Sequence, residues 1–487
     1  MFNEDRIFFI NSNIADSFQI DDFDKYIKSI GGNIGNSYIT YSVIKILYGD
    51  YRSVSDIKNL WLYQPNKTDI DKINNEFTKV VLILQDNLRP FDSYYGHNTY
   101  SFLADFFKAI KIPIVVFSLG CNYFNENYHD LVPLLNKDLI NLLKIIADKT
   151  VSFGVRGEVS KEILYKIGIY NVDVVGCPSY YECGRGRIVK KPKVDNLKIV
   201  SGGFFESSNF DVNYVLQDES LFIKNIFFQK ERITEKDLEK FSFDNPYHNL
   251  LFNKLLENRL HYFNNIEQWK SFNKEFDFYV GTRVHGAIVT LNSGLPAVIT
   301  NKDLRAREMS NLFGIKNCDV LKDDNLFDLY ESIDVDLVNK RYIELFEIFE
   351  KWLNKNDLKF IQNSIPKKDT YHEVINTNND NYDLRLVNIL FNEFKNQKNS
   401  EIKELEDKNI SNLLKLEGQY NRVLDELNKI NNEMRLRQIE IDNIRNFTKK
   451  NCLNYKIKRI LIKIFSCFII KKNIRKQYRD SLLNKII

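Results

Sequence analysis

An arginine and a histidine two residues apart, Arg283 and His285, form the pair with the clearest chemical potential in the sequence. They follow the apolar run Phe276–Val280 and the turn Gly281-Thr282, at the start of the helix-like stretch Val284–Asn292. This order places both residues at the carboxyl end of a strand, where a helix N-terminus favours an anion. Arg283 offers a planar charged fork to a carboxylate or phosphate, and His285 offers a group that titrates near neutral pH. The pair predicts an anion-binding site with an acid–base residue; the alternative is a structural arginine beside a capping histidine.

Three further arginines occupy similar places in the sequence. Arg156 follows the strand-like run Val151–Val155, and Arg305 and Arg307 lie just beyond a second run, Ala297–Thr300. Because the carboxyl ends of parallel strands meet at one edge of a sheet, these side chains could face the cleft that Arg283 faces. For Arg305 and Arg307 a solvated charge run is the alternative.

Two small-residue segments also sit where a ligand could approach. The segment Gly31–Asn36 precedes the helix-like stretch Ser37–Tyr48, and it lacks the GK[ST] ending of a nucleotide-binding loop. Its glycines allow close backbone approach, and asparagine amides can bond sugar hydroxyls, although a simple tight turn is the alternative. The segment Gly176–Ser179 follows the run Val172–Val175. No base lies near Cys177 in the sequence, so a packing or cleft-lining role is favoured for it over that of a nucleophile.

The elements that must position these residues read as strands and helices in alternation. Apolar runs such as Val80–Leu84, Ile114–Ser118 and Leu197–Ser201 are short and bounded by turn residues, and amphipathic stretches such as Leu131–Lys149 separate them. This alternation predicts parallel sheets covered by helices, in an α/β fold of two Rossmann-like domains. The polar, Gly- and Pro-containing interval Gly184–Asn196 separates the halves, which gives an N-terminal domain at residues 1–190 and a second at 197–366.

The pattern changes after a polar connector at residues 367–400. Residues 401–448 carry a heptad seam of about four to five repeats, which predicts a coiled coil that joins copies of the chain; a single helix folded back on the body is the alternative. Its apolar positions are Leu413, Leu416, Tyr420, Val423, Leu427, Ile430, Met434, Ile441 and Ile444. Residues 449–487 surround the apolar stretch Ile460–Ile470 with basic side chains, which fits an anionic membrane surface or, alternatively, a protein partner.

The composition limits the class of protein. The chain has 487 residues, 44% of them hydrophobic, and its 69 Lys and Arg nearly balance its 65 Asp and Glu, so overall charge argues against a nucleic-acid binder. The six cysteines lack CxxC spacing and the six histidines lack HxxxH or HxH spacing, which predicts reduced thiols and no metal site. Neither a secretory signal nor an apolar run of about 18 residues is visible, so we expect a cytoplasmic protein, peripheral at most on the inner face of the membrane.

Taken together, the motifs resemble those of the polysaccharide pyruvyl transferase family. The resemblance rests on an ordered set across roughly residues 30–320: Gly31–Asn36, Val155–Glu158, Gly176–Ser179, Gly281–Gly286, Gly294–Pro296 and Asp303–Glu308. Many members carry aspartate at the positions of Asn36 and Cys177, and a branch of the family looks similar to this chain at both. The coiled coil and the basic tail lie outside the resemblance.

The resemblance implies a fold like that of the two-domain GT-B glycosyltransferases, with the site in the cleft between the domains. It implies transfer of pyruvate from phosphoenolpyruvate to two hydroxyls of a sugar in a cell-surface polysaccharide or its precursor, as a ketal, without cofactor or metal. The acceptor would be a glycan or a lipid-linked glycan. His285 and Arg283 would be catalytic, and Arg156, Arg283, Arg305 and Arg307 would bind the donor. The acceptor side or cleft would comprise Asn33, Gly35, Asn36, Asn87 and Ser179.

Two other functions fit parts of the sequence. A GT-B glycosyltransferase that uses a nucleotide sugar would share the fold and bind a diphosphate near Arg283, although no clear acidic pair for a ribose is visible. A non-catalytic coiled-coil scaffold of glycan assembly is the other alternative, and the joint presence of Arg156, Arg283 and His285 speaks against it.

Overall fold

The computed structural model describes most of the first 361 residues and little beyond them. The described ranges are 6–17, 22–54, 56–60, 62–90, 98–123, 127–203, 205, 207, 209–224, 245–300, 303–318 and 326–361, with scattered residues between 403 and 429. Contacts divide the chain into two units, Met1–Leu384 and Arg385–Ile487. Within the second unit the described residues are helical and exposed, whereas the predicted seam residues and the basic tail lie outside the described residues.

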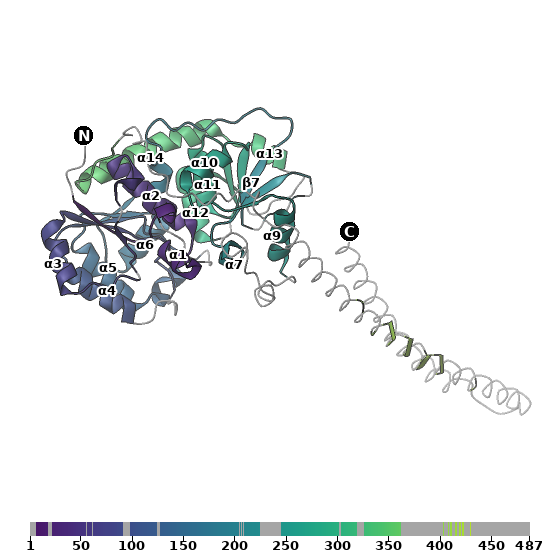
Figure 1. Ribbon diagram of the computed structural model, residues 1–487, viewed down its shortest axis with the longest axis horizontal. Coiled ribbons are helices and arrows are strands. Elements are labelled where there is room, and N and C mark those ends of the chain that lie inside the picture. Colours follow the sequence, from purple (N-terminus) through teal and green to yellow (C-terminus); the bar gives the residue numbers. More distant parts are fainter. Residues whose placement is uncertain are drawn as a thin grey trace, which may run out of the picture. The chain divides into compact units, whose positions relative to one another are not determined.

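A parallel sheet forms the centre of the first half of unit one. Its strands are β1 (Ile7–Ile10), β2 (Ile57–Lys58), β3 (Lys79–Ile83) and β4 (Ile114–Phe117), in the order β2-β1-β3-β4. A further parallel pair, β5 (Phe153–Val155) and β6 (Val172–Val174), continues from it through a bridge between Leu119 and Val155. The helices are α1 (Phe23–Ser29), α2 (Ile34–Tyr48), α3 (Lys67–Glu76), α4 (Asn98–Ala109), α5 (Lys137–Ala147) and α6 (Glu158–Lys166), and Figure 1 shows them around the sheet.

The second half contains a larger parallel sheet. Its order is β12-β11-β10-β7-β8-β9, and all its neighbours pair in parallel. The strands are β7 (Ile199–Gly202), β8 (Val212–Val215), β9 (Leu260–His261), β10 (Phe278–Gly281), β11 (Ala297–Thr300) and β12 (Lys316–Cys318). The helices are α7 (Ser220–Phe222), α9 (Pro246–Leu256), α10 (Ile266–Asn273), α11 (Val284–Asn292), α12 (Leu304–Phe313), α13 (Leu326–Glu331) and α14 (Val335–Lys355). The predicted α/β class with parallel sheets and helices is therefore confirmed.

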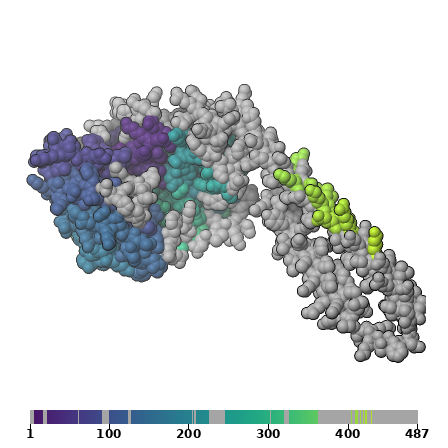
Figure 2. Space-filling model, turned by 90° about the horizontal axis from the view of Figure 1, so that it is seen from below, coloured from purple at the N-terminus to yellow at the C-terminus, as the bar shows by residue number. Residues whose placement is uncertain are grey.

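The final helix of the second half returns to the first half. Trp352 of α14 lies 4.8 Å, centroid to centroid, from the ring of Phe117 in β4, and its indole N–H donates to the carbonyl of Ser152 at 3.2 Å. Its ring also fills the space beside Gly154, where a Cβ would come within 2.7 Å of it. Figure 1 shows α14 near α2, and Figure 2 shows the purple-to-blue first half directly against the teal second half.

The central strands of the first sheet are buried on both faces. All four residues of β1 are buried, as are all five of β3, which is the pattern of a strand covered by helices on both sides. The strand β1 lies before residue 30, where the sequence pattern was expected to begin, and it pairs with both β2 and β3. Among the described residues, no helix is both long enough and apolar enough to cross a membrane.

Candidate functional site

His285 lies where the two halves meet. It is in the first turn of α11, directly after β10, and its ring faces Gly35 in the first turn of α2. A Cβ on Gly35 would come within 2.3 Å of the His285 Nδ1, so only a glycine leaves room for the ring there. Asn33, the N-cap of α2, fixes this turn by accepting a hydrogen bond from the Gly35 N–H at 2.6 Å.

The opposite side of the imidazole contacts a thiol. The Sγ of Cys177 lies 3.9 Å from the His285 Nε2 and 3.0 Å from the Oγ of Ser179. Cys177 and Ser179 come from the segment after β6, so this contact joins residues 108 positions apart in the chain. Both side chains are buried.

Arg156 is the next group around the thiol. It follows β5, its side chain is 1% exposed, and its Nε donates to the Ser118 Oγ at 3.0 Å. The Ser118 hydroxyl in turn donates to the Cys177 Sγ at 3.8 Å. The Arg156 Nη2 is buried without a hydrogen-bond partner, although most buried polar groups have one. A charged donor of this kind is ready for an anionic oxygen.

Arg305 reaches the same region from the second half. It lies in the first turn of α12, and its Nη1 forms an ion pair with Asp86, at 3.1 Å from Oδ2, just beyond β3. Asp86 also accepts a hydrogen bond from the Asn122 amide at 2.9 Å. We call His285, Cys177, Arg156, Arg305 and Asp86 the His285 cluster.

The electrostatics of the His285 cluster keep the imidazole neutral. Burial lowers the pKa of His285 well below its ordinary value of 6.5, and the positive charges of Arg156 and Arg305 lower it further against the opposing effect of Asp86. Burial raises the pKa of Asp86, but the charges of Arg305, Arg156 and Arg89 outweigh that effect and lower it overall. The cluster holds two guanidinium groups. Arg305 pairs with Asp303 at 3.3 Å as well as with Asp86, whereas the Nη2 of Arg156 keeps an open donor position.

Arg283 contacts a different group of residues from those around His285. As N-cap of α11 it makes no side-chain cap bond; its Nη1 donates to Asp218 at 2.7 Å and its Nη2 to Glu219 at 3.0 Å. Tyr247 donates to the same Glu219 oxygen at 2.6 Å. These carboxylates raise the pKa of Arg283 despite its burial. The structure thus places Arg283 beside two anions, while His285, two residues on, faces the cluster.

The other predicted residues divide between the cluster and its borders. Arg307 leaves α12 about 200° away from Arg305, because successive helical residues are rotated by about 100°. The Asn36 amide donates to the Gly31 carbonyl at 2.8 Å, so in this structure it closes its own loop. Gly35 and Ser179 contact the cluster directly.

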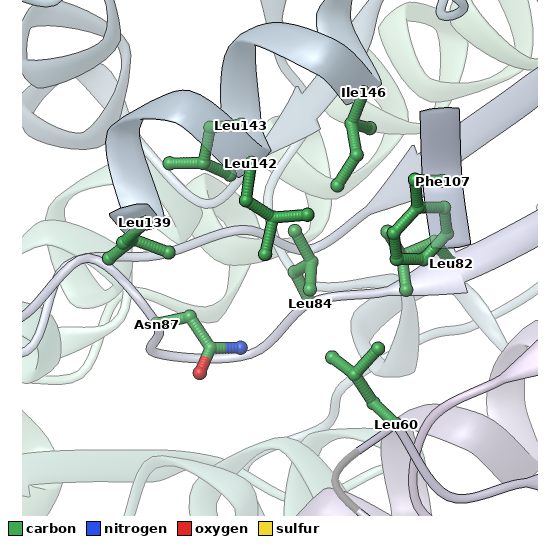
Figure 3. Close-up of a pocket in the computed structure, with 9 residues that line it drawn as sticks. All are labelled: Leu60, Leu82, Leu84, Asn87, Phe107, Leu139, Leu142, Leu143 and Ile146. Atoms are coloured by element: carbon green, nitrogen blue, oxygen red, sulfur yellow. The ribbon is translucent and has the colours of Figure 1, made fainter. Parts of the chain in front are cut away.

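Asn87, expected on the acceptor side or in the cleft, borders an apolar pocket within the first half, between β3, α4 and α5 (Figure 3). The other residues that line this pocket are Leu60, Leu82, Leu84, Phe107, Leu139, Leu142, Leu143 and Ile146. Hydrocarbon walls cannot hydrogen-bond a sugar hydroxyl, so the pocket itself is no acceptor site. The predicted acceptor role of Asn87 stays a prediction.

A family profile matches most of unit one. The polysaccharide pyruvyl transferase profile covers residues 33–301, more than half of the chain. The chain belongs to this family. The predicted resemblance is thereby confirmed, as is the prediction that the protein is a transferase enzyme. No curated protein matches the chain.

Solved structures give only distant likenesses to this pyruvyl transferase family member. A Staphylococcus aureus MnaA–UDP complex is 10% identical, with 74% of this chain and 100% of that chain covered and a TM-score of 0.35. Anabaena HepE in complex with UDP and glucose is 9% identical, with 72% and 97% covered and a TM-score of 0.36. UDP-GlcNAc 2-epimerase from Neisseria meningitidis is 11% identical, with 72% and 100% covered and a TM-score of 0.36. TM-scores of this size do not establish a shared fold, so neither fold nor function is taken from them.

Sequence reasoning missed several residues of this transferase's site. Asp86 and Ser118 each follow a buried strand, β3 and β4, so the strand-end rule that selected Arg156 could have selected them too. Ser118 also adopts a φ of +64°, which is uncommon outside glycine and points to a functional constraint. Within the described ranges, no group of three or more His, Cys, Asp or Glu side chains could hold a metal ion.

Proposed function

We propose that this enzyme transfers pyruvate from phosphoenolpyruvate to two hydroxyls of a cell-surface polysaccharide sugar or its precursor, forming a ketal. Membership of the family supports the pyruvyl transfer, and the His285 cluster supports the donor. The observation that carries the proposal is the buried Arg156, whose Nη2 has no hydrogen-bond partner and whose charge helps to keep the His285 imidazole neutral.

The donor carries a carboxylate and a phosphate, so it needs two cationic contacts. Arg156 would hold one anionic group through its open Nη2. Arg305 would hold the other by sharing its charge among the donor, Asp86 and Asp303. Holding the donor at fixed positions lowers the entropic part of the barrier. Arg283 would reach the donor only by exchanging contacts with Asp218 and Glu219, so we expect its contribution to be smaller than that of Arg156.

His285 would act on the acceptor's protons. A neutral imidazole accepts a proton from a hydroxyl that attacks the central carbon of the donor, and its neutrality follows from burial and two neighbouring guanidinium groups. Gly35 and Ser179 border the same space, and they and Asn33 and Asn36 remain our proposal for the acceptor side. A GT-B-like arrangement of the halves, a cytoplasmic location and self-association through residues 401–448 also remain proposals.

A calorimetric titration with phosphoenolpyruvate tests the proposal. We expect saturable binding to the wild type and at least about a tenfold weaker affinity for Arg156→Ala, the loss of roughly one charge-assisted contact. Arg283→Ala should lose less than Arg156→Ala. Arg185→Ala is the matched control, because Arg185 is half exposed and pairs with Glu350 and Glu347 far along α14.

Thermal-shift measurements with nucleotide sugars supply the opposing outcome. Stabilisation by phosphoenolpyruvate but not by UDP-sugars supports the proposal, because a ligand that binds only the folded state raises the unfolding temperature. Stabilisation by a UDP-sugar with no phosphoenolpyruvate binding would replace the proposed reaction by glycosyl transfer.

A further inference from the structure

The thiol of Cys177 lies at the centre of the His285 cluster, although nothing near it in the sequence marks it as reactive. Its Sγ is 3.9 Å from the His285 Nε2. Ser179 of the same segment lies 3.0 Å from it, and Ser118, from a distant segment, donates to it while accepting from Arg156. Distant parts of the chain therefore supply the base that the local sequence lacks. A thiol packed only against hydrocarbon would need none of these polar neighbours.

The surroundings of the thiol are suited to a negative charge on sulfur. Arg156 is linked to the thiol through Ser118, because its Nε donates to the Ser118 Oγ at 3.0 Å. The Ser118 hydroxyl donates to the Sγ at 3.8 Å, and the Ser179 hydroxyl lies 3.0 Å from it. A guanidinium and hydroxyl donors are the groups that stabilise a thiolate in a buried site.

Pyruvyl transfer requires a proton donor as well as a base. The methylene carbon of phosphoenolpyruvate must gain a proton before its central carbon can be attacked. His285 is neutral in this structure, which suits a base and leaves the donor role to another group. The Cys177 thiol carries a transferable proton and lies 3.9 Å from the Nε2 of His285.

We propose that Cys177 is the catalytic proton donor to the methylene carbon of phosphoenolpyruvate, with His285 as the base that accepts the acceptor hydroxyl's proton. This inference rests on the proposed function. It assigns the acid and the base of one reaction to two residues in contact, so that protons can pass between them.

The S–H bond of Cys177 breaks and leaves its electrons on sulfur, while the π electrons of the donor form the new C–H bond. The first acceptor oxygen bonds to the cationic central carbon, and its proton passes to His285 and from there to the Cys177 thiolate across the 3.9 Å contact. The bond to phosphate then breaks, the second hydroxyl takes its place, and that hydroxyl's proton leaves with the phosphate. The products are the ketal carboxylate and hydrogen phosphate, and the enzyme returns to its starting state.

Affinity labelling tests the position of the thiol without an acceptor. 3-Bromopyruvate has a carboxylate for the donor site and an electrophilic carbon where the donor has its methylene. In the wild-type full chain, peptide mass spectrometry should find Cys177 alkylated before the other cysteines, with loss of bromide. Phosphoenolpyruvate at about ten times its dissociation constant leaves only about one site in ten unoccupied. It should therefore slow this labelling by about tenfold. Labelling of Cys183 and Cys318 with Cys177 unmodified, or labelling of Cys177 that phosphoenolpyruvate does not slow, would overturn the proposal.

Substitutions test the proton transfer itself. Phosphate release is measured with p-nitrophenyl glycosides that carry a free diol. Cys177→Ser and Cys177→Ala should lose about a hundredfold or more in kcat, the usual size of a general-acid contribution, while calorimetry shows unchanged phosphoenolpyruvate affinity. Cys177→Asp retains a transferable proton and should recover part of kcat with a shifted pH profile. Cys318→Ser, half-buried at the end of β12, is the matched control and should match the wild type.

The two proposals fail in different ways. Wild-type turnover by Cys177→Ala with normal phosphoenolpyruvate binding would remove the proton donor and leave the proposed function standing. Absence of phosphoenolpyruvate binding by the wild type would remove both.

Discussion

The charge state of His285 depends on individual neighbours, and this dependence can be measured at the scale of single residues. Burial, Arg156 and Arg305 lower its pKa well below 6.5, so the imidazole stays unprotonated to a lower pH than that of an ordinary histidine. In the proposed mechanism, protonation of this base stops catalysis. The acid limb of kcat/KM for phosphoenolpyruvate should therefore lie below pH 6.5.

Arg305→Gln provides the test of this electrostatic control. Removal of one nearby positive charge makes protonation of His285 easier, so the pKa rises and the acid limb should move to higher pH. Rates of phosphate release across pH 4.5 to 8.5 would show the shift. Lys161→Gln removes an exposed charge, paired with Glu158 on α6, and should leave the limb in place. An unmoved limb in Arg305→Gln would mean that burial and Arg156 alone set the pKa.

Sequence reasoning at this scale recovered residues that follow strands and missed contacts between distant segments. Arg156, Arg305 and His285 were identified because each comes after an apolar run, and the structure brings all three into one cluster. The contact of Cys177 with His285 spans 108 positions, and only the packing of the two halves creates it. Likewise, nothing local to Arg283 indicates that Asp218 and Glu219 would hold its guanidinium.

At the scale of elements, the first turns of α2 and α11 pack against each other through Gly35 and His285. A Cβ at residue 35 would lie 2.3 Å from the His285 Nδ1, and backbone holds it there, so the imidazole must move. Gly35→Ala should therefore lower kcat by about tenfold or more, since small displacements of catalytic groups are costly. Gly186→Ala is the matched control, because a Cβ there meets nothing within 4 Å. Equal kcat for the two variants would show that the ring tolerates displacement.

A second contact between the two halves joins α12 to the start of α6. Glu308 of α12 is buried, and its carboxylate accepts from the Ser160 N–H at 2.8 Å and from the Ser160 hydroxyl at 3.1 Å. A carboxylate at a helix N-terminus is favourable, yet burial raises the pKa of Glu308 from 4.5 to about 7. Between pH 4.5 and 7 the folded state therefore binds more protons than the unfolded state, so this residue's contribution to stability falls as pH rises through that window.

Glu308→Gln should remove that pH dependence. Glutamine keeps an oxygen for the Ser160 N–H but does not ionise. The free energy of unfolding of the variant should therefore rise relative to that of the wild type between pH 4.5 and 7, by up to about 3 kcal/mol. Above pH 7 the difference should stay constant. Denaturant unfolding at several pH values measures the difference. Glu344→Gln, in an exposed pair on α14, should follow the wild type at every pH. A constant offset for Glu308→Gln would contradict the raised pKa.

Most of the strands could be predicted, since their apolar runs are bounded by turn residues. The expected run Ala297–Thr300 coincides with β11, and Val284–Asn292 coincides with α11. The strand β1 was missed because four apolar residues near a chain end give no alternation to recognise. Helix α14 has a strong apolar stripe, but no sequence pattern indicates that Trp352 would pack on β4 and β5 of the other half.

At the scale of the described unit, a buried ion network joins the two halves. Glu182, in the segment after β6, accepts from Lys45 of α2 and from Lys270 of α10, each at 2.7 Å. Tyr38 adds a hydrogen bond at 3.3 Å. The carboxylate is fully buried, so its pairing with a lysine from each half ties their relative placement to one charged group.

The remaining sequence predictions at this scale concern residues 401–487. The coiled-coil seam and the basic tail lie outside the described residues, so oligomerisation and contact with an anionic surface stay predictions. Sedimentation of the full chain with phosphatidylglycerol or phosphatidylcholine vesicles tests the second. Binding to the anionic vesicles that weakens with added salt would support it, since screening reduces attraction between exposed charges.

Glu182 should control the stability of the whole described unit. Burial raises its pKa, but the charges of Lys270 and Lys45 outweigh that and lower it to about 2. A carboxyl whose pKa is lowered in the folded state stabilises the fold at pH values above its ordinary pKa of 4.5. This stabilisation is lost as the pH falls from 4.5 toward 2. At pH 7, Glu182→Gln leaves Lys45 and Lys270 to share the half-exposed Glu267 as an acidic partner, at 3.1 and 3.6 Å, and should cost about 3 kcal/mol in denaturant unfolding. Adding Lys270→Met should restore part of that loss, because one of the two ammonium groups that then share Glu267 is removed.

Glu350→Gln is the control. It breaks only an exposed pair and should change stability by about 0.5 kcal/mol or less. A loss of similar size at pH 3 and pH 7 in Glu182→Gln would show that packing, and not charge, joins the halves at this point.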